Sequence, residues 1–151
     1  MLPLKKIVCP TDFSKPSVEG LRIGLELAQK FDAELIVLYV IEPPGWSGQV
    51  YSPPVSNLTE MKTAIKEETI KNLNKLQSEL IPEYVRYRLL TAEGKPAEEI
   101  VKLSVNESAG LIVIATHGYS GFHRFVFGSV TERVVRTSKC PVLTVRPSID
   151  T

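Results

Sequence analysis

The stretch of sequence that decides the fold is IVIATHGYSGFHRFVFGSVTER, at residues 112–133. It opens with aliphatic, mostly β-branched residues, which are typical of a strand buried on both faces of a parallel sheet. Three glycines follow, at positions 118, 121 and 128, and helical spacing begins after Ser129. A strand that runs through such a loop into a helix is part of a strand–helix–strand unit. The stretch therefore predicts an α/β protein with a parallel sheet.

The same alternation of strand and helix runs along the rest of the chain. Between the predicted strands, apolar residues recur every three or four positions, which predicts helices, although polar Thr69 interrupts one series. Right-handed crossovers of this kind place helices on both faces of the sheet. A length of 151 residues fits one domain, 1–151. The apolar runs predict five strands, at residues 6–9, 34–41, 84–90, 111–115 and 142–145.

The charge of the chain is close to balanced, with 18 basic and 17 acidic residues. Neither a nucleic acid nor an anionic membrane is therefore expected as a partner, because both attract a strongly basic surface. The first residues lack the apolar stretch of a secretory signal, and no run approaches the length of a membrane span. We expect a cytoplasmic protein whose ligand is held by local geometry.

Residues 42–57 are irregular, with four prolines and two glycines. Prolines at this density exclude both a helix and a central strand. Trp46 and Tyr51 would give such a loop adhesive side chains, so it could be a lid or a partner surface. A plain connection that packs over the next helix is the alternative.

Ligands of open parallel sheets bind beyond the carboxyl ends of the strands. The glycines Gly118, Gly121 and Gly128 would let backbone N–H groups approach an anion without an intervening Cβ. The helix that begins near Ser129 adds unpaired N–H donors and a partial positive charge. Together these features predict a phosphate cradle.

Some of these residues also have purely structural interpretations. Ser129 and Glu132 have the spacing of a capping box, and capping is the favoured role for Ser129. Asp12 follows the first strand, where its carboxylate could accept hydrogen bonds from an adenine amino group or from ribose hydroxyls. Alternatively, Asp12 or Ser14 could cap the helix whose first turn holds Pro16.

Other phosphate and metal signatures are missing from the sequence. The pattern Gly-x-x-x-x-Gly-Lys-Ser/Thr does not occur, which argues against a P-loop nucleotidase. No Gly-x-Gly-x-x-Gly follows the first strand, which argues against a dinucleotide site. His117 and His123 have no third ligand at a useful spacing, so a zinc site is not expected.

The chain resembles the universal stress protein family over about residues 4 to 147. The resemblance rests on its opening KIVCPTDFS (6–14), on LYVI (38–41), on GKPAEEI (94–100) and on SKCPVL (138–143). It also rests on that family's ATP pattern of Gly, two residues, Gly, nine residues, Gly and Ser or Thr. Here Gly118, Gly128 and Ser129 match the pattern, whereas Ala115 stands at the first glycine and adds a methyl group beside the phosphates or ribose.

The resemblance implies an adenine nucleotide alpha hydrolase-like fold with five parallel strands in the order 3-2-1-4-5. It implies a homodimer formed by antiparallel pairing of the last strand, Val142–Val145, which is apolar and would otherwise be an open edge. ATP, with Mg²⁺ or Mn²⁺ as a possible companion, would be the ligand. Adenine and ribose would contact Pro10, Thr11, Asp12 and Val40, while Ala115, His117, Gly118, Gly128, Ser129 and Val130 would surround the ribose and phosphates.

Three functions are compatible with these features. The favoured one is a nucleotide-binding regulatory protein of the stress response. The second is an interaction module of the same fold that binds no nucleotide. The third is a slow ATPase, for which only Asp12, His117, His123 and Arg124 are candidates and no catalytic pairing is recognisable.

Overall fold

Five strands alternate with four helices over the described residues of the computed structural model, which are 3–43, 57–117 and 127–148. In chain order the elements are β1 (Lys6–Pro10), α1 (Lys15–Phe31), β2 (Glu34–Ile41), α2 (Leu58–Leu80), β3 (Tyr87–Glu93), α3 (Pro96–Asn106), β4 (Leu111–Ala115), α4 (Ser129–Thr137) and β5 (Val142–Val145).

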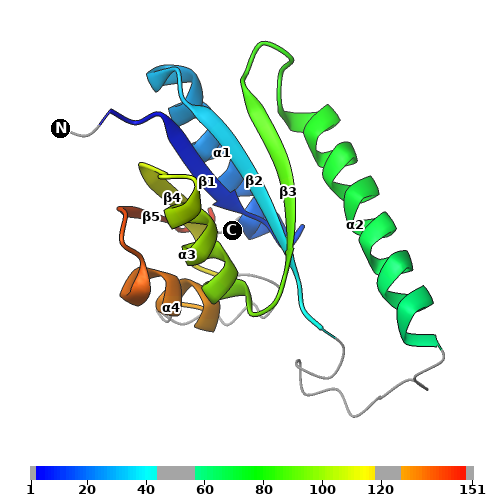
Figure 1. Ribbon diagram of the computed structural model, residues 1–151. Helices are drawn as coiled ribbons and strands as arrows, with labels where there is room; N and C mark the ends of the chain where they lie inside the picture. The colour runs from blue at the N-terminus through cyan, green and yellow to red at the C-terminus, as the bar shows by residue number, and fades with distance from the viewer. Residues whose placement is uncertain (1–2, 44–56, 118–126, 149–151) are drawn as a thin grey trace.

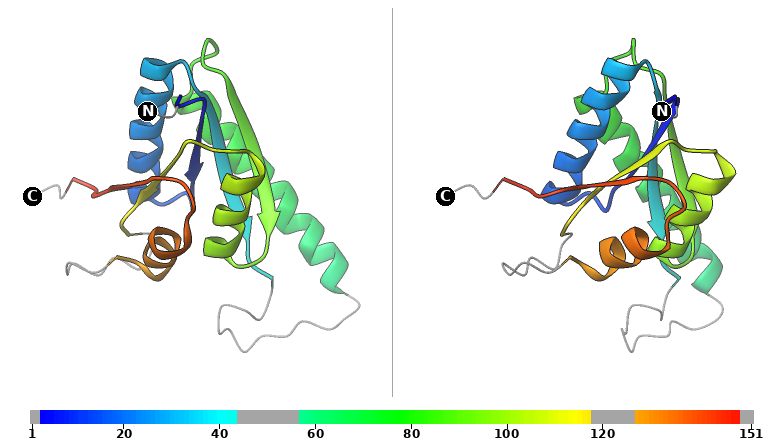
Figure 2. Two further views of the ribbon diagram at one scale, coloured as in Figure 1. Left: turned by 60° about the vertical axis from the view of Figure 1, so that its left-hand side comes forward. Right: turned by 90° about the vertical axis from the view of Figure 1, so that its left-hand side faces the viewer.

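The strands form one sheet in the order β3-β2-β1-β4-β5, and every neighbouring pair is parallel. Helices α1 and α2 cover one face of the sheet, and α3 and α4 cover the other (Figures 1 and 2). The predicted parallel sheet, its strand order and its two helical layers are confirmed. Because strand order reverses beside β1, the carboxyl ends of β1 and β4 form the position where such folds bind ligands.

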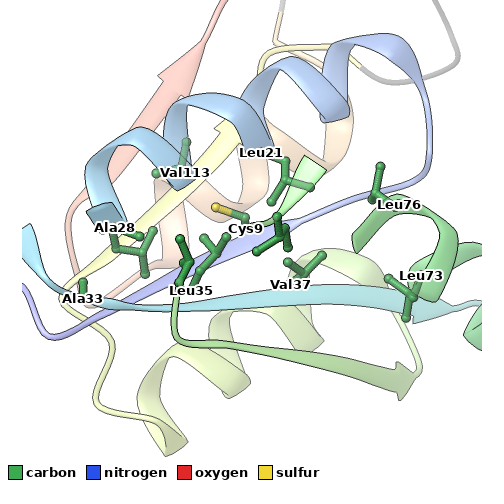
Figure 3. Close-up of a cluster of buried hydrophobic side chains, with 12 residues drawn as sticks. Cys9, Leu21, Ala28, Ala33, Leu35, Val37, Leu73, Leu76 and Val113 are labelled. Carbon is green, nitrogen blue, oxygen red and sulfur yellow. The ribbon is translucent and has the colours of Figure 1, made fainter. Parts of the chain in front are cut away.

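Each face of the sheet has its own apolar core. On the α1 and α2 face, side chains of β1 and β2 pack against Leu21, Ala28, Leu73 and Leu76 of the two helices (Figure 3). Cys9 lies within this core as a free thiol, and burial raises the pKa of that thiol. Its sulfur fills the space beside Gly24, where an added Cβ would overlap it. Close packing of α1 on β1 therefore depends on a residue without a side chain at this position.

Two expected segments differ in detail from the structure. The third strand is Tyr87–Glu93 rather than 84–90. It begins later because the Val85 N–H donates to the Pro82 carbonyl (3.0 Å) and closes a turn there. In α2, the interrupting Thr69 is buried, and its hydroxyl donates to the Ile65 carbonyl (2.7 Å). This local bond lets a polar residue occupy the apolar stripe.

Most of the proline-rich segment 42–57 lies outside the described residues, including Trp46 and Tyr51, so its interpretation as a lid or partner surface stays a prediction. Among the helices that the structure describes, none is both long and apolar enough to cross a membrane.

A network of ion pairs joins elements at the amino end of the sheet. Arg88 of β3 contacts Glu34 of β2 (Nε to Oε1, 2.7 Å) and Glu107 after α3 (Nη2 to Oε2, 2.6 Å). Lys6 of β1 reaches the same Glu107 oxygen at 2.8 Å. The hydrogen bonds from Arg88 and then from Lys6 lower the pKa of Glu107 to about 2. This network lies at the end of the sheet opposite to the carboxyl ends of the strands.

Candidate functional site

A cavity of about 730 Å³ opens at the carboxyl ends of β1, β2 and β4. Gly118 and Gly121 lie outside the described residues. All the other predicted site residues line this cavity: Pro10, Thr11, Asp12, Val40, Ala115, His117, Gly128, Ser129 and Val130. Residues more than a hundred positions apart in the sequence therefore share one cavity, and their contacts with a ligand stay a prediction.

The sequence interpretation missed the apolar wall of this cavity. Ile65 of α2 and Pro96 and Ile100 of α3 line it together with Ile114 of β4. The helices of a βαβ fold run antiparallel to the strands, so their first turns lie near the carboxyl edge of the sheet. The position of Pro96 at the start of a predicted helix was therefore a usable signal, whereas no local signal pointed to Ile65.

The turn after β1 is ordered by hydroxyl and carboxylate contacts. Thr11 Oγ1 accepts the Phe13 N–H (3.0 Å) and lies 3.0 Å from Ser17 Oγ. Asp12 Oδ1 accepts the Ser14 N–H (3.0 Å) and also the Ser14 hydroxyl. Ser14 is the N-cap of α1, and its Oγ accepts the Ser17 N–H at 3.3 Å. Ser14 thus caps the helix, while Asp12 orders the cap and lines the cavity.

The start of α4 differs from the expected capping box. Gly128 is the N-cap and Ser129 is the first helical residue, with no side-chain cap hydrogen bond. The Glu132 N–H donates to the Gly128 carbonyl (2.9 Å), and the Glu132 side chain pairs with Arg136. The prediction that Ser129 caps this helix is therefore wrong, because the helix begins one residue earlier than a Ser129 cap requires.

Gly128 brings the start of α4 against the end of β4. Its N–H donates to the Thr116 carbonyl at 2.8 Å, and an added Cβ would lie 3.4 Å from the same oxygen. Thr131 Oγ1 donates to the Ala115 carbonyl (2.7 Å) and holds the first turn of the helix in place. The backbone N–H groups of a first helical turn have no partners within the helix. Together with the Ser129 hydroxyl, they form a donor set suited to an anion.

His117 places a second polar group beside this helix start. Its Nδ1 lies 2.9 Å from Thr116 Oγ1, so Thr116 influences which nitrogen carries the proton. Its Nε2 is buried and has no hydrogen-bond partner among the residues that the structure describes. A buried nitrogen on the wall of a cavity is a natural contact for a polar ligand.

No described group of three or more His, Cys, Asp or Glu side chains could hold a metal ion. Among the residues that the structure describes, Asp12 and Glu42 are the carboxylates that line the cavity.

Comparison with known proteins identifies the family. Residues 3–146 match the sequence profile of the universal stress protein family. The chain belongs to the universal stress protein family. It is 35% identical over 142 residues to universal stress protein MJ0531 of Methanocaldococcus jannaschii, covering 94% of this chain and 82% of that protein.

Solved structures of universal stress proteins share its fold. The structure of MJ0577 from the same archaeon has a TM-score of 0.79 and 29% identity and covers 99% of this chain and all of the other. This similarity confirms the adenine nucleotide alpha hydrolase-like fold. A more distant universal stress protein was solved in complex with cAMP; it has 22% identity and a TM-score of 0.64, and the match covers 97% of this chain and 100% of the other. The universal stress protein of Archaeoglobus fulgidus was solved in complex with dAMP; it has 21% identity and a TM-score of 0.62, and the match covers 95% of this chain and 98% of the other.

Ala115 is where this universal stress protein departs from the expected pattern. Ala115 is a residue of β4 and is not among the described residues with positive φ, so its backbone does not require glycine. An added Cβ at Gly20 of α1 would lie 3.8 Å from the Ala115 methyl. The Ala115 methyl group therefore lies beside Gly20 of α1, which has no side chain. Ala115 also lines the cavity, so the contact of its methyl group with a phosphate or ribose stays a prediction.

Proposed function

We propose that this universal stress protein binds ATP in the cavity and acts as a regulator of the stress response, through nucleotide-dependent conformation or partner binding. The observation that carries the proposal is the uncapped start of α4. Ser129, Val130 and Thr131 of its first turn line the same cavity as Asp12. A phosphate and the sugar or base attached to it require this combination of donors and acceptor.

The dimensions and lining of the cavity support a nucleotide. Its volume of about 730 Å³ is within the range of roughly 300–1,000 Å³ that small-molecule sites occupy. The cavity has an apolar wall that includes Val40, Ile100 and Ile114. Transfer of the apolar faces of an adenine ring from water onto this wall would be favourable. The cAMP and dAMP complexes of distant family members are consistent with an adenine nucleotide in this fold.

A divalent cation, Mg²⁺ or Mn²⁺, would enter with the phosphates of ATP. The described residues provide no metal site of three ligands, so phosphate oxygens and water would complete its coordination. Of the described carboxylates, Asp12 and Glu42 are the ones on the cavity wall.

The proposal also includes a homodimer in the cytoplasm. β5 pairs with β4 on one side, and no described strand pairs with its other side. Leu143 on this edge has 38% of its surface exposed. Proteins rarely leave an apolar edge strand unpaired, because it invites pairing with another chain. Antiparallel pairing with β5 of a second copy would cover it.

The test begins with the purified protein. Heat denaturation followed by chromatography and mass spectrometry should release an adenine nucleotide, and calorimetry on nucleotide-free protein should detect ATP binding. Gly128→Val should abolish that binding, since branched carbons would crowd the start of α4 against Thr116. Gly110→Val, at the other end of β4, places a Cβ 3.0 Å from the Leu4 side chain and so controls for general crowding; it should retain ATP binding.

Absence of both released nucleotide and calorimetric binding would reject the proposal and favour the interaction module. Phosphate release above background that is lost on changing Asp12 or His117 would instead indicate slow hydrolysis.

A further inference from the structure

Phe13 has an unusual backbone conformation next to the cavity. Its φ is +64°, in the left-handed region, where bulky residues are rare. The other described non-glycine residues with positive φ are Asp32 and Ser108, which are short, polar and located just after helices. Asp32 and Ser108 therefore have an ordinary explanation as helix ends, whereas Phe13 requires another one.

The ring of Phe13 provides that explanation. It stacks on Tyr39 of β2, with ring centroids 4.8 Å apart and planes 18° apart. Both rings are partly buried against the core on the α1 face, and Tyr39 also lines the cavity. The Phe13 N–H donates to Thr11 Oγ1 (3.0 Å), which holds the backbone of the same residue. Stacking and hydrogen bonding together stabilise the left-handed conformation.

The conformation of Phe13 decides where Asp12 lies. Asp12 directly precedes it, and Ser14, whose N–H donates to Asp12 Oδ1 at 3.0 Å, directly follows it. A rotation of Phe13 out of the left-handed region would therefore change the geometry between these two residues. One carboxylate oxygen of Asp12 is used by Ser14, and Oδ2 accepts no hydrogen bond from the described residues. Oδ2 is the oxygen available to a ligand in the cavity.

We propose that Phe13 is a positioning residue of the nucleotide site, whose ring on Tyr39 orients Asp12 toward the adenine amino group or the ribose hydroxyls. This inference rests on the proposed function and goes beyond it, because Phe13 itself does not line the cavity. Its role is to keep Asp12 in one orientation before the nucleotide arrives. Such preorganisation improves affinity by lowering the cost of ordering on binding.

The test is a double-mutant cycle on ATP affinity, measured by calorimetry with the full chain. The variants are Phe13→Leu, Asp12→Asn and their combination. Phe13→Leu should weaken ATP binding about tenfold in the natural background, as expected for a lost hydrogen bond to a carboxylate. In the Asp12→Asn background, Phe13→Leu should lower ATP affinity by less than twofold. Such non-additivity marks residues that act as a unit.

Further variants separate the ring from the backbone and from general destabilisation. Phe13→Tyr keeps the ring and should retain nearly full ATP affinity. Phe13→Gly removes the ring but accepts positive φ without strain, and it should lose as much ATP affinity as Phe13→Leu. Phe31→Leu, at the exposed end of α1, makes the same change away from the cavity and should leave affinity unchanged.

The outcomes distinguish this inference from the proposed function. If the unsubstituted protein binds ATP but Phe13→Leu costs the same factor in both backgrounds, Phe13 is only a structural residue and the inference is wrong. Full affinity of Phe13→Gly would also overturn it, since the ring would then be dispensable. If the unsubstituted protein binds no nucleotide, the proposed function fails and the inference fails with it.

Discussion

Replacing Ser129 with alanine separates two roles that a hydroxyl can have at the start of a helix. The sequence suggested a cap, for which the loss would be about 1 kcal/mol of stability. In the structure Gly128 occupies the cap position and Ser129 makes no cap hydrogen bond. We therefore expect Ser129→Ala to change the free energy of unfolding by less than about 0.5 kcal/mol, as for surface substitutions without a special contact.

The same substitution should weaken ATP binding. Ser129 lines the cavity in the first turn of α4, where the backbone N–H groups have no partners within the helix. A hydrogen bond from a neutral donor to a charged phosphate contributes about 1.5 kcal/mol or more, so affinity should fall roughly tenfold. Calorimetric titration measures the affinity, and urea denaturation of the nucleotide-free protein measures stability.

Ser14→Ala is the matched control for stability. Ser14 is a true N-cap whose Oγ accepts the Ser17 N–H (3.3 Å), so its loss should cost about 1 kcal/mol. A comparable loss in Ser129→Ala, with ATP affinity intact, would refute the reasoning and restore the capping role. Intact stability together with intact affinity would show that Ser129 contacts no phosphate.

Other predictions concern the core, the ion-pair network and the sheet edge. Gly24→Ala should cost about 1–3 kcal/mol in urea denaturation, because its Cβ would overlap the Cys9 sulfur, and Cys9→Ala in the same chain should recover part of the loss. Glu107→Gln should cost about 1 kcal/mol at neutral pH, where Glu107 is ionised and paired with Arg88. Because the pKa of Glu107 is lowered from 4.5 to about 2, its stabilisation is present above pH 4.5 and is lost as the pH falls through about 2. The difference in the free energy of unfolding between Glu107→Gln and the unsubstituted protein should therefore shrink between pH 4.5 and about 2. Leu143→Lys should abolish the proposed dimer and lower the sedimentation coefficient in sedimentation velocity, and an unchanged coefficient would argue against pairing through β5.

Much of the fold was predictable from local patterns. Apolar runs such as 34–41 must be strands covered on both faces, and helical spacing between them leaves few alternatives to a parallel sheet. The third strand was misplaced because Tyr84 and Val85 fit the composition of a strand. A turn closed by a backbone hydrogen bond from Val85 to Pro82 excludes them from the strand. Backbone bonds of this kind are not encoded in hydrophobicity.

By itself, the sequence determined the order of strands and helices and the residues that follow each strand, because periodicity and glycine spacing are properties of neighbouring positions. Only the tertiary structure decided how those residues are used. The methyl of Ala115 lies beside Gly20 of α1, and α4 begins one residue earlier than a Ser129 cap requires, where the Gly128 N–H bonds to Thr116. Phe13 takes a left-handed conformation beside a ring from β2. Each of these depends on contact between segments that are distant along the chain, and no local pattern records such contacts.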